Sequence, residues 1–393
     1  MKIGLMGLDF ESNNLGCVAL SYGFLEIIKK ANNRINDSIT IILFEKCNID
    51  DIKNYLKGTG IKVKVAPEIS IKSISGFVSQ LKYYSLCDVI FDFTAGDSFS
   101  DIYGKKRFFS RSFRKEMVLM SHTPLVLGSQ TYGPFNNLFV RILASHIIKK
   151  SFRVFSRDAI STSIVQKLSG IKPIETVDIA FELPYSYQKT KHDSMIIGFN
   201  PSGLLWSGGY TGNNQFKLKS NYKSFCNRLI KSLIEKYDAR IKLIAHVRSN
   251  NIDSQDNDLN ACNDIMRHFP GVFEPPIYFY TPMQAKSYIS DLDIFIGSRM
   301  HATIASYTTG VVTIPISYSR KFKGLFDSIH YSYCVDLCSE NLEDSIRKIH
   351  KMIDNRRILK DNLLHNKPII NYKLKYLEDK ITETLIKIHE QKV

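Results

Sequence analysis

The stretch Ile294-Phe-Ile-Gly-Ser-Arg-Met-His-Ala-Thr-Ile-Ala305 joins an apolar strand to a helix through a Gly-Ser turn. We expect Ser298 to cap the helix, so that free backbone N–H groups lie beside the guanidinium of Arg299 and the imidazole of His301. Open α/β sheets bind anionic ligands where their parallel strands end. The pattern therefore predicts a phosphate or carboxylate site, although an ordinary strand-to-helix turn fits the local sequence equally well.

The composition is that of a globular protein with more than one domain. The chain has 393 residues, of which 44% are hydrophobic and 23% are charged, enough for two domains with a core each. The first residues predict a strand followed by a polar loop rather than a secretion signal, and no apolar run reaches the roughly 18 residues that span a bilayer. Seven scattered cysteines predict reduced, buried thiols in a cytoplasmic protein.

The formal net charge of +15 has two explanations. It can simply reflect a lysine-rich composition, or it can serve an anionic partner. The sequence has neither a nucleic-acid-binding module nor a basic stripe interleaved with exposed aromatic residues, so we expect no nucleic-acid partner. Anionic substrates or an anionic membrane surface fit the dispersed basic runs better. The spacing of Asp, Glu and His residues predicts no metal site.

Strands that alternate with helices predict an α/β protein with two doubly wound, Rossmann-like domains. The strands are nearly unbroken apolar runs, which is typical of parallel sheets covered on both faces. We expect one domain over residues 1–184 and a second over residues 195–355, joined by the polar linker 185–194. Residues 356–393 have a helical period, and we expect this segment to cross back to the first domain.

Several motifs together resemble the signature of the polysaccharide pyruvyl transferase family. The stretch from Gly297 to Ala305 carries the most specific part, and the resemblance extends over about residues 1–355. The other motifs are Asn13-Asn-Leu-Gly16, Phe93-Thr-Ala-Gly-Asp-Ser98, Gly128 to Pro134, Ser156-Arg-Asp158, Asp178, His246, Pro315-Ile-Ser-Tyr-Ser319 and Lys321-Phe-Lys-Gly324. One departure is Thr94-Ala95, where two glycines are common, and it makes close approach of that loop to a ligand harder.

The resemblance implies an architecture similar to that of glycosyltransferases of the B type, with the site in an interdomain cleft. It also implies transfer of a pyruvyl group from phosphoenolpyruvate to a sugar hydroxyl pair as a ketal, in surface polysaccharide biosynthesis and without a cofactor. His301 would be the catalytic acid, together with Arg299. The donor would contact Arg157, Ser298, Arg299, Met300, His301 and Lys321, and the acceptor Asn13, Asn14, Asp97, His246 and Tyr318.

Other interpretations of these residues stay open. Arg157 can instead form an ion pair with Asp158, Lys321 can be a solvated member of a basic run, and His246 can be a buried structural histidine. The chain could also be a nucleotide-sugar-dependent glycosyltransferase of the same architecture, or a non-catalytic membrane-associated scaffold.

The saccharide acceptor could be linked to polyprenyl diphosphate, which would place the protein peripherally at the inner membrane face. The run Lys105 to Lys115 would then contact anionic lipid, unless its aromatic residues point into a core.

Overall fold

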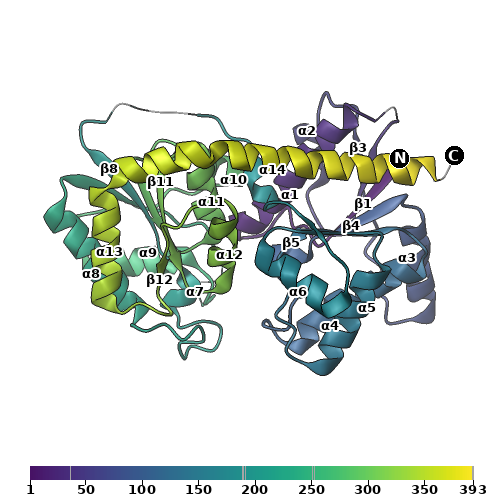
Figure 1. Ribbon diagram of the computed structural model, residues 1–393, viewed down its shortest axis with the longest axis horizontal. Coiled ribbons are helices and arrows are strands. Elements are labelled where there is room, and N and C mark those ends of the chain that lie inside the picture. The colour runs from purple at the N-terminus through teal and green to yellow at the C-terminus, as the bar shows by residue number, and fades with distance from the viewer. Residues whose placement is uncertain (36, 188–189, 191, 250, 252, 392–393) are drawn as a thin grey trace. The chain divides into compact units, whose positions relative to one another are not determined.

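The computed structural model describes residues 1–35, 37–187, 190, 192–249, 251 and 253–391 (Figure 1). The chain divides into two compact units. Unit 1 comprises Met1–Ser12, Leu20–Glu182 and Asn371–Val393, and unit 2 comprises Asn13–Ala19 and Leu183–Ile370. Residues 188, 189 and 191 of the predicted linker, and 392 and 393 of the predicted last segment, lie outside the described residues.

Unit 1 contains a seven-stranded parallel sheet with the order β3-β2-β1-β4-β5-β6-β7. Strand β1 pairs with β2 on one side and β4 on the other, so that Gly4 lies opposite both Ile42 and Ile90. The strands are β1 (Lys2–Met6), β2 (Thr40–Leu43), β3 (Lys62–Val65), β4 (Val89–Asp92), β5 (Leu125–Gln130), β6 (Arg153–Ser156) and β7 (Ile174–Glu175).

The helices of unit 1 cover both faces of this sheet. Because crossover connections are right-handed, the change of direction between β1 and β4 puts α1 and α2 on one face and α3 to α6 on the other. Neighbouring helices from α3 to α6 pack against each other in a row. The helices are α1 (Leu15–Asn32), α2 (Ile49–Tyr55), α3 (Ile74–Ser85), α4 (Lys105–Met120), α5 (Leu138–Lys150) and α6 (Ala159–Ser169).

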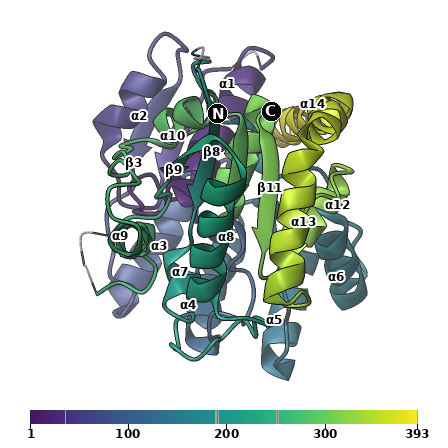
Figure 2. The same cartoon turned by 90° about the vertical axis from the view of Figure 1, so that its left-hand side faces the viewer.

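Unit 2 contains a five-stranded parallel sheet with the order β12-β11-β10-β8-β9. In Figure 2 the helices α8 and α13 lie side by side over this sheet. The strands are β8 (Met195–Asn200), β9 (Ala239–Leu243), β10 (Ile294–Gly297), β11 (Val312–Ser317) and β12 (Val335–Asp336). The helices are α7 (Gly203–Trp206), α8 (Tyr222–Lys236), α9 (Asp258–His268), α10 (Pro282–Ile289), α11 (Met300–Thr309), α12 (Arg320–Ser328) and α13 (Leu342–Asp354). The predicted α/β class with two doubly wound units is therefore confirmed.

The last helix, α14 (Arg356–Glu390), has residues in both units. Within unit 2, the Lys360 ammonium donates to the carbonyl oxygen of Gly310. Within unit 1, Arg34 forms an ion pair with Asp379, and Arg153 forms another with Glu383 at 3.1 Å. Although α14 has 35 residues, it is too polar to cross a bilayer, and no other helix in the described part of the chain is both long and apolar enough to do so.

The seven cysteines are reduced thiols, as the sequence predicts. Their predicted burial is only partly right. Cys87, Cys226 and Cys262 are buried, whereas Cys17, Cys47, Cys334 and Cys338 are half-buried.

A short 3₁₀ turn, η1 (Thr94–Gly96), follows β4 and contains a strained backbone. Thr94 and Ala95 have φ angles of 44° and 54°, and Gly96 has a φ of 83°. Left-handed angles are unfavourable for residues with a Cβ atom, especially a β-branched one. The chain passes close to Gly7 here, because the N–H of Ala95 donates to the carbonyl oxygen of Gly7 at 2.7 Å. The departure from two glycines thus falls where glycine is the least strained residue.

Ala95→Gly should stabilise the protein by about 1 kcal/mol, because removing the left-handed strain outweighs the extra chain entropy of glycine. The matched control is Ala159→Gly in the exposed first turn of α6, which should instead lower the stability by up to about 1 kcal/mol. Denaturant unfolding of both variants measures the difference. Equal destabilisation by both substitutions would contradict strain at Ala95.

Candidate functional site

The strand order of unit 2 identifies where a ligand is expected to bind. The chain reverses its direction of winding between β8 and β10, and ligands of open α/β sheets bind at the carboxyl ends of the strands beside such a reversal. Asn200 ends β8 and lies directly opposite Gly297, the last residue of β10. Ser298 and Arg299 follow Gly297 directly, and His301 is the second residue of α11, so these predicted site residues lie at the switch point.

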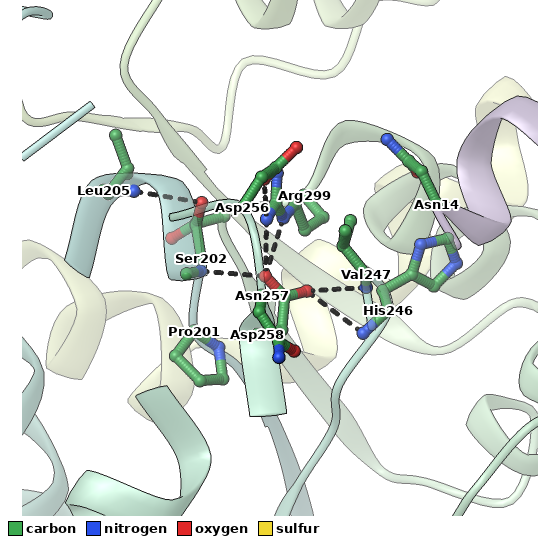
Figure 3. Close-up of polar contacts among 12 residues, drawn as sticks. Asn14, Pro201, Ser202, Leu205, His246, Val247, Asp256, Asn257, Asp258 and Arg299 are labelled. Atoms are coloured by element: carbon green, nitrogen blue, oxygen red, sulfur yellow. Dashed lines mark hydrogen bonds and ion pairs between the residues drawn. The ribbon is translucent and has the colours of Figure 1, made fainter. Parts of the chain in front are cut away.

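A fully buried carboxylate, that of Asp258, organises these strand ends (Figure 3). Its Oδ1 accepts from the N–H of Gly203 at 2.8 Å, and its Oδ2 accepts from the N–H groups of His246 and Val247 at 3.1 and 2.9 Å. The loops after β8 and β9 are therefore joined through one side chain. Three backbone donors and a guanidinium satisfy the buried charge, which would be very unfavourable if left unpaired.

Arg299 is that guanidinium partner. Its Nε and Nη2 donate to Oδ1 of Asp258 at 2.9 and 2.6 Å, and Nη2 also donates to the half-buried Asp256. Its backbone N–H donates to Oδ1 of Asn200 at 3.0 Å. Burial by itself would lower the pKa of Arg299, but the carboxylates of Asp258 and Asp256 raise it well above its usual range. Arg299 is thus a permanently charged and rigidly held residue.

The predicted helix cap is wrong. The N-cap of α11 is Arg299, whose side chain makes no capping hydrogen bond, and Ser298 precedes the cap. The Ser298 hydroxyl instead accepts a hydrogen bond from the Tyr222 hydroxyl at 2.8 Å. The Tyr222 hydroxyl in turn accepts one from the N–H of Ser202 at 2.9 Å. Because the side chain of Arg299 lies on Asp258, it does not cap the first turn of α11.

The segment Asn13–Ala19 packs on the loop after β9. Asn14 forms an antiparallel bridge with Val247, in which the Leu15 N–H donates to the His246 carbonyl oxygen at 3.2 Å. The structure thereby brings Asn13, Asn14 and His246 together, as Figure 3 shows for the last two.

Gly16, the second residue of α1, packs directly on His301. A Cβ atom on Gly16 would lie only 2.8 and 2.9 Å from Cγ and Cβ of His301, which is too close for real side chains. The glycine is therefore required by the position of the imidazole ring, and it fixes one wall of the space around that ring.

His246 is a second imidazole at this site, and it is buried. Burial lowers its pKa to about 3, and the charges of His301 and Arg299 act in the same direction. His246 is therefore neutral near neutral pH and can donate or accept a hydrogen bond without changing charge. It lies three residues beyond the end of β9, which stops at Leu243.

Two further predicted residues of unit 2 follow β11. Tyr318 is buried, and its ring packs edge-on against Phe216 with the ring centres 4.9 Å apart. Lys321, in the first turn of α12, is half-buried. Met300 begins α11 and is buried.

The two predicted residues of unit 1 lie at the strand ends of its own sheet. Arg157 follows β6, is completely buried, and forms an ion pair with Asp178 at 2.6 Å. Asp158 lies farther from it, at 3.9 Å, and caps α6. Asp97 follows η1, is half-buried, and accepts a hydrogen bond from the Tyr103 hydroxyl at 2.7 Å. The roles of both residues in ligand binding stay predictions.

Comparison with known families decides which family the chain represents. The model of the family described as polysaccharide pyruvyl transferase matches residues 14–320, a range that includes Asn14, His246, Asp258, Arg299 and His301. The chain belongs to the polysaccharide pyruvyl transferase family. A search of curated proteins matches none by sequence.

Solved structures similar to this pyruvyl transferase family member share its fold. A glycosyltransferase from Rickettsia africae aligns with a TM-score of 0.63 at 10% identity, over 98% of each chain. Anabaena HepE in complex with UDP and glucose aligns at 0.61 and 11%, again over 98% of each chain. The UDP-GlcNAc 2-epimerase of Neisseria meningitidis, bound to UDP-GlcNAc, aligns at 0.60 and 12%, over 98% of this chain and 100% of that one. These identities establish the fold alone, which is the glycosyltransferase B architecture.

Sequence reasoning missed the residues that hold the site together. Asp258 reads as an ordinary acidic residue in a helix first turn, and Asn200 as the end of a strand. The sequence does not reveal that Asp258 and Asn200 are buried, because their burial results from contacts between segments that are distant in the chain. Among the described residues, no group of three or more His, Cys, Asp and Glu side chains is placed to hold a metal ion.

The low pKa of His246 predicts a specific acid sensitivity. In the unfolded chain this histidine takes up a proton near pH 6.5, whereas in the folded protein it does so only near pH 3. Stability should therefore fall as the pH drops below about 6.5, by up to about 1.4 kcal/mol per pH unit. Between pH 6.5 and 5 the parent should lose about 1.6 kcal/mol more than His246→Gln, measured by denaturant unfolding. Parallel loss in both proteins would show that His246 is protonated when folded.

Proposed function

We propose that this protein transfers a pyruvyl group from phosphoenolpyruvate to two hydroxyl groups of a saccharide. Protonation of the donor at its methylene carbon makes C2 electrophilic, and one sugar oxygen bonds to C2. The bond between C2 and the phosphate oxygen then breaks, and the second sugar oxygen bonds to C2. A cyclic ketal with a new methyl group forms, inorganic phosphate leaves, and the two hydroxyl protons replace those taken up by the methyl carbon and the phosphate.

One observation supports this site most strongly. The helix α11 begins at the switch point of the sheet, next to a charged Arg299, and carries the imidazole of His301 on its second residue. A helix N-terminus attracts anions through its backbone N–H groups and the helix dipole. Phosphoenolpyruvate carries a phosphate and a carboxylate, and the family to which the chain belongs transfers pyruvyl groups.

Arg299 can act on the donor mainly through its field and its position. Nε and Nη2 bind Asp258 and Asp256, which leaves Nη1 as the guanidinium nitrogen for which the described residues supply no partner. Asp258 and Asp256 together carry two negative charges, whereas Arg299 carries one positive charge. An anionic donor therefore needs further cations. We propose Lys321 and Arg157 for this role, and Arg157 would have to open its buried ion pair with Asp178 to serve.

His301 is proposed as the acid that protonates the methylene carbon. An imidazole is the side chain that most often serves as a general acid in enzymes. Gly16 packs against the imidazole ring of His301 and fixes its orientation toward a bound donor. His246 cannot share this role because its pKa near 3 keeps it neutral, and we propose that it holds a hydrogen bond to the substrate or to the loop.

We propose a saccharide as the acceptor, with Asn13, Asn14, Asp97 and Tyr318 as candidate contacts. Amide and carboxylate side chains at strand ends suit the hydroxyl groups of sugars, and an aspartate can also accept a hydroxyl proton. Phosphoenolpyruvate is a cytoplasmic metabolite, so the proposal places the protein in the cytoplasm. A polyprenyl-diphosphate-linked acceptor would bring it to the inner membrane face.

His301→Gln should lower turnover by about 10² to 10⁴-fold, the usual contribution of a general acid, while phosphoenolpyruvate binding changes little. Phosphate release from phosphoenolpyruvate in the presence of a saccharide panel measures turnover, and calorimetry measures donor binding. The control is His268→Gln, on an exposed histidine at the end of α9, which should behave as the parent.

Two outcomes would contradict the proposal. Unchanged turnover of His301→Gln would remove this residue from catalysis. Sugar transfer from a UDP-sugar by the parent, without phosphate release from phosphoenolpyruvate, would instead favour a nucleotide-sugar-dependent glycosyltransferase.

A further inference from the structure

Two neighbouring helices of unit 1 have an unusual exposed surface. α4 and α5 follow β4 and β5, which are parallel, so both helices start at the carboxyl edge of the sheet and pack against each other (Figure 1). The exposed surface formed by Ile102, the first three turns of α4 and the first two turns of α5 is called the α4–α5 face below. It consists of Ile102, Lys105, Lys106, Phe109, Phe113, Leu138, Phe139, Arg141 and Ile142.

The α4–α5 face exposes large apolar side chains that helices of a soluble sheet normally bury. Leu138, Phe139 and Ile142, at consecutive turns of α5, are 63%, 70% and 59% exposed. On α4, Phe109 and Phe113 are 39% and 44% exposed. Phe108 alone among the aromatic residues of α4 points into the core. A concentration of exposed apolar groups of this kind marks an interaction site.

The charge of this face has one sign. Lys105, Lys106 and Arg141 are exposed, and Glu116 is the only acidic residue on either helix. The later cations of α4 belong to the interior of unit 1, since Arg114 pairs with Glu45 and the fully buried Lys115 pairs with Asp92. The exposed cations therefore remain available for an external anionic surface, while the inner ones stabilise the fold.

Hydrogen bonds connect the starts of α4 and α5 to the loop that follows β4. Arg107 donates to the Ser98 hydroxyl at 2.9 Å. Asp101 accepts from the N–H groups of Asn136 and Asn137 at 2.8 and 2.9 Å, and Asn137 caps α5. The loop that contains Asp97 is thus held against the first turns of both helices. A partner that binds the α4–α5 face therefore also lies beside the loop that contains Asp97.

We propose that the α4–α5 face docks on an anionic lipid bilayer. The apolar side chains enter the boundary between headgroups and acyl chains, and the lysines and the arginine bind the lipid phosphates. Apolar and aromatic side chains next to cations are the combination that binds peripheral proteins to anionic membranes. The inference extends the proposed function, because it would place the loop of Asp97 at the depth where the sugar of a lipid-linked acceptor begins.

The experiment measures co-sedimentation of the full chain with vesicles. Vesicles of phosphatidylcholine containing one third phosphatidylglycerol should bind the parent, and pure phosphatidylcholine vesicles should bind it much less. Binding should weaken as salt is raised, because exposed charges are screened within about 8 Å at physiological ionic strength. The variant Leu138→Ser/Phe139→Ser/Ile142→Ser and the variant Lys105→Ser/Lys106→Ser/Arg141→Ser should each lower the partition constant by at least about tenfold.

Two control variants replace exposed apolar or basic side chains by Ser outside the α4–α5 face. Ile358→Ser/Leu364→Ser/Tyr372→Ser alters side chains of α14 that are 57%, 50% and 71% exposed, and Lys57→Ser/Lys62→Ser/Lys64→Ser removes three exposed charges near β3. Both controls should bind within about twofold of the parent. Circular dichroism and the unfolding midpoint establish that each variant is folded.

Two results would overturn the inference. In one, the α4–α5 variants sediment as well as the parent and the controls. In the other, the parent forms a dimer on gel filtration that the apolar variant dissociates, so that a second copy of the chain covers the face. Phosphate release with phosphoenolpyruvate and water-soluble saccharides separates this inference from the proposed function. Loss of vesicle binding with intact turnover contradicts membrane docking alone, and vesicle binding without any turnover in the parent contradicts the proposed function alone.

Discussion

The candidate site depends on one buried carboxylate. Asp258 accepts hydrogen bonds from the backbone of two loops and from the guanidinium of Arg299, so it joins the ends of β8, β9 and β10. A charge completely removed from water is tolerated only with this full set of donors. The geometry of the strand ends is therefore strongly coupled: the position of Arg299, the start of α11 and the loop of His246 are fixed together.

Buried ion pairs also occur at the strand ends of unit 1. Lys115 pairs with Asp92 at 2.9 Å, and Arg157 pairs with Asp178, all four side chains being buried. Burial lowers the pKa of Lys115, and the charge of Asp92 opposes this shift. Both units thus use internal ion pairs to order loops at the carboxyl edge of a parallel sheet. Such pairs favour one loop arrangement over others, which suits loops that must position substrates.

The sequence was sufficient to predict what depends on local pattern. The apolar runs predicted two doubly wound units, and the Gly-Ser-Arg-Met-His motif predicted the turn from β10 into α11. The local sequence pattern gave wrong predictions where a residue distant in the chain determines the hydrogen-bond partner of a side chain. Ser298 does not cap α11 because Tyr222, 76 positions away, binds its hydroxyl, and Arg299 is drawn to Asp258, 41 positions away. The exposure of Phe109 and Phe113 likewise depends on the packing of α4 in three dimensions.

The central claim is that the Asp258 carboxylate holds the strand ends of unit 2 together. The most direct measurement compares the free energies of unfolding of Asp258→Asn and Asp256→Asn, because both carboxylates bind Arg299 but only Asp258 is fully buried. We expect Asp258→Asn to lose about 3 to 5 kcal/mol, since it leaves a buried guanidinium without its main partner, and Asp256→Asn to lose at most about 1 kcal/mol. Similar, small losses in both variants would contradict the account.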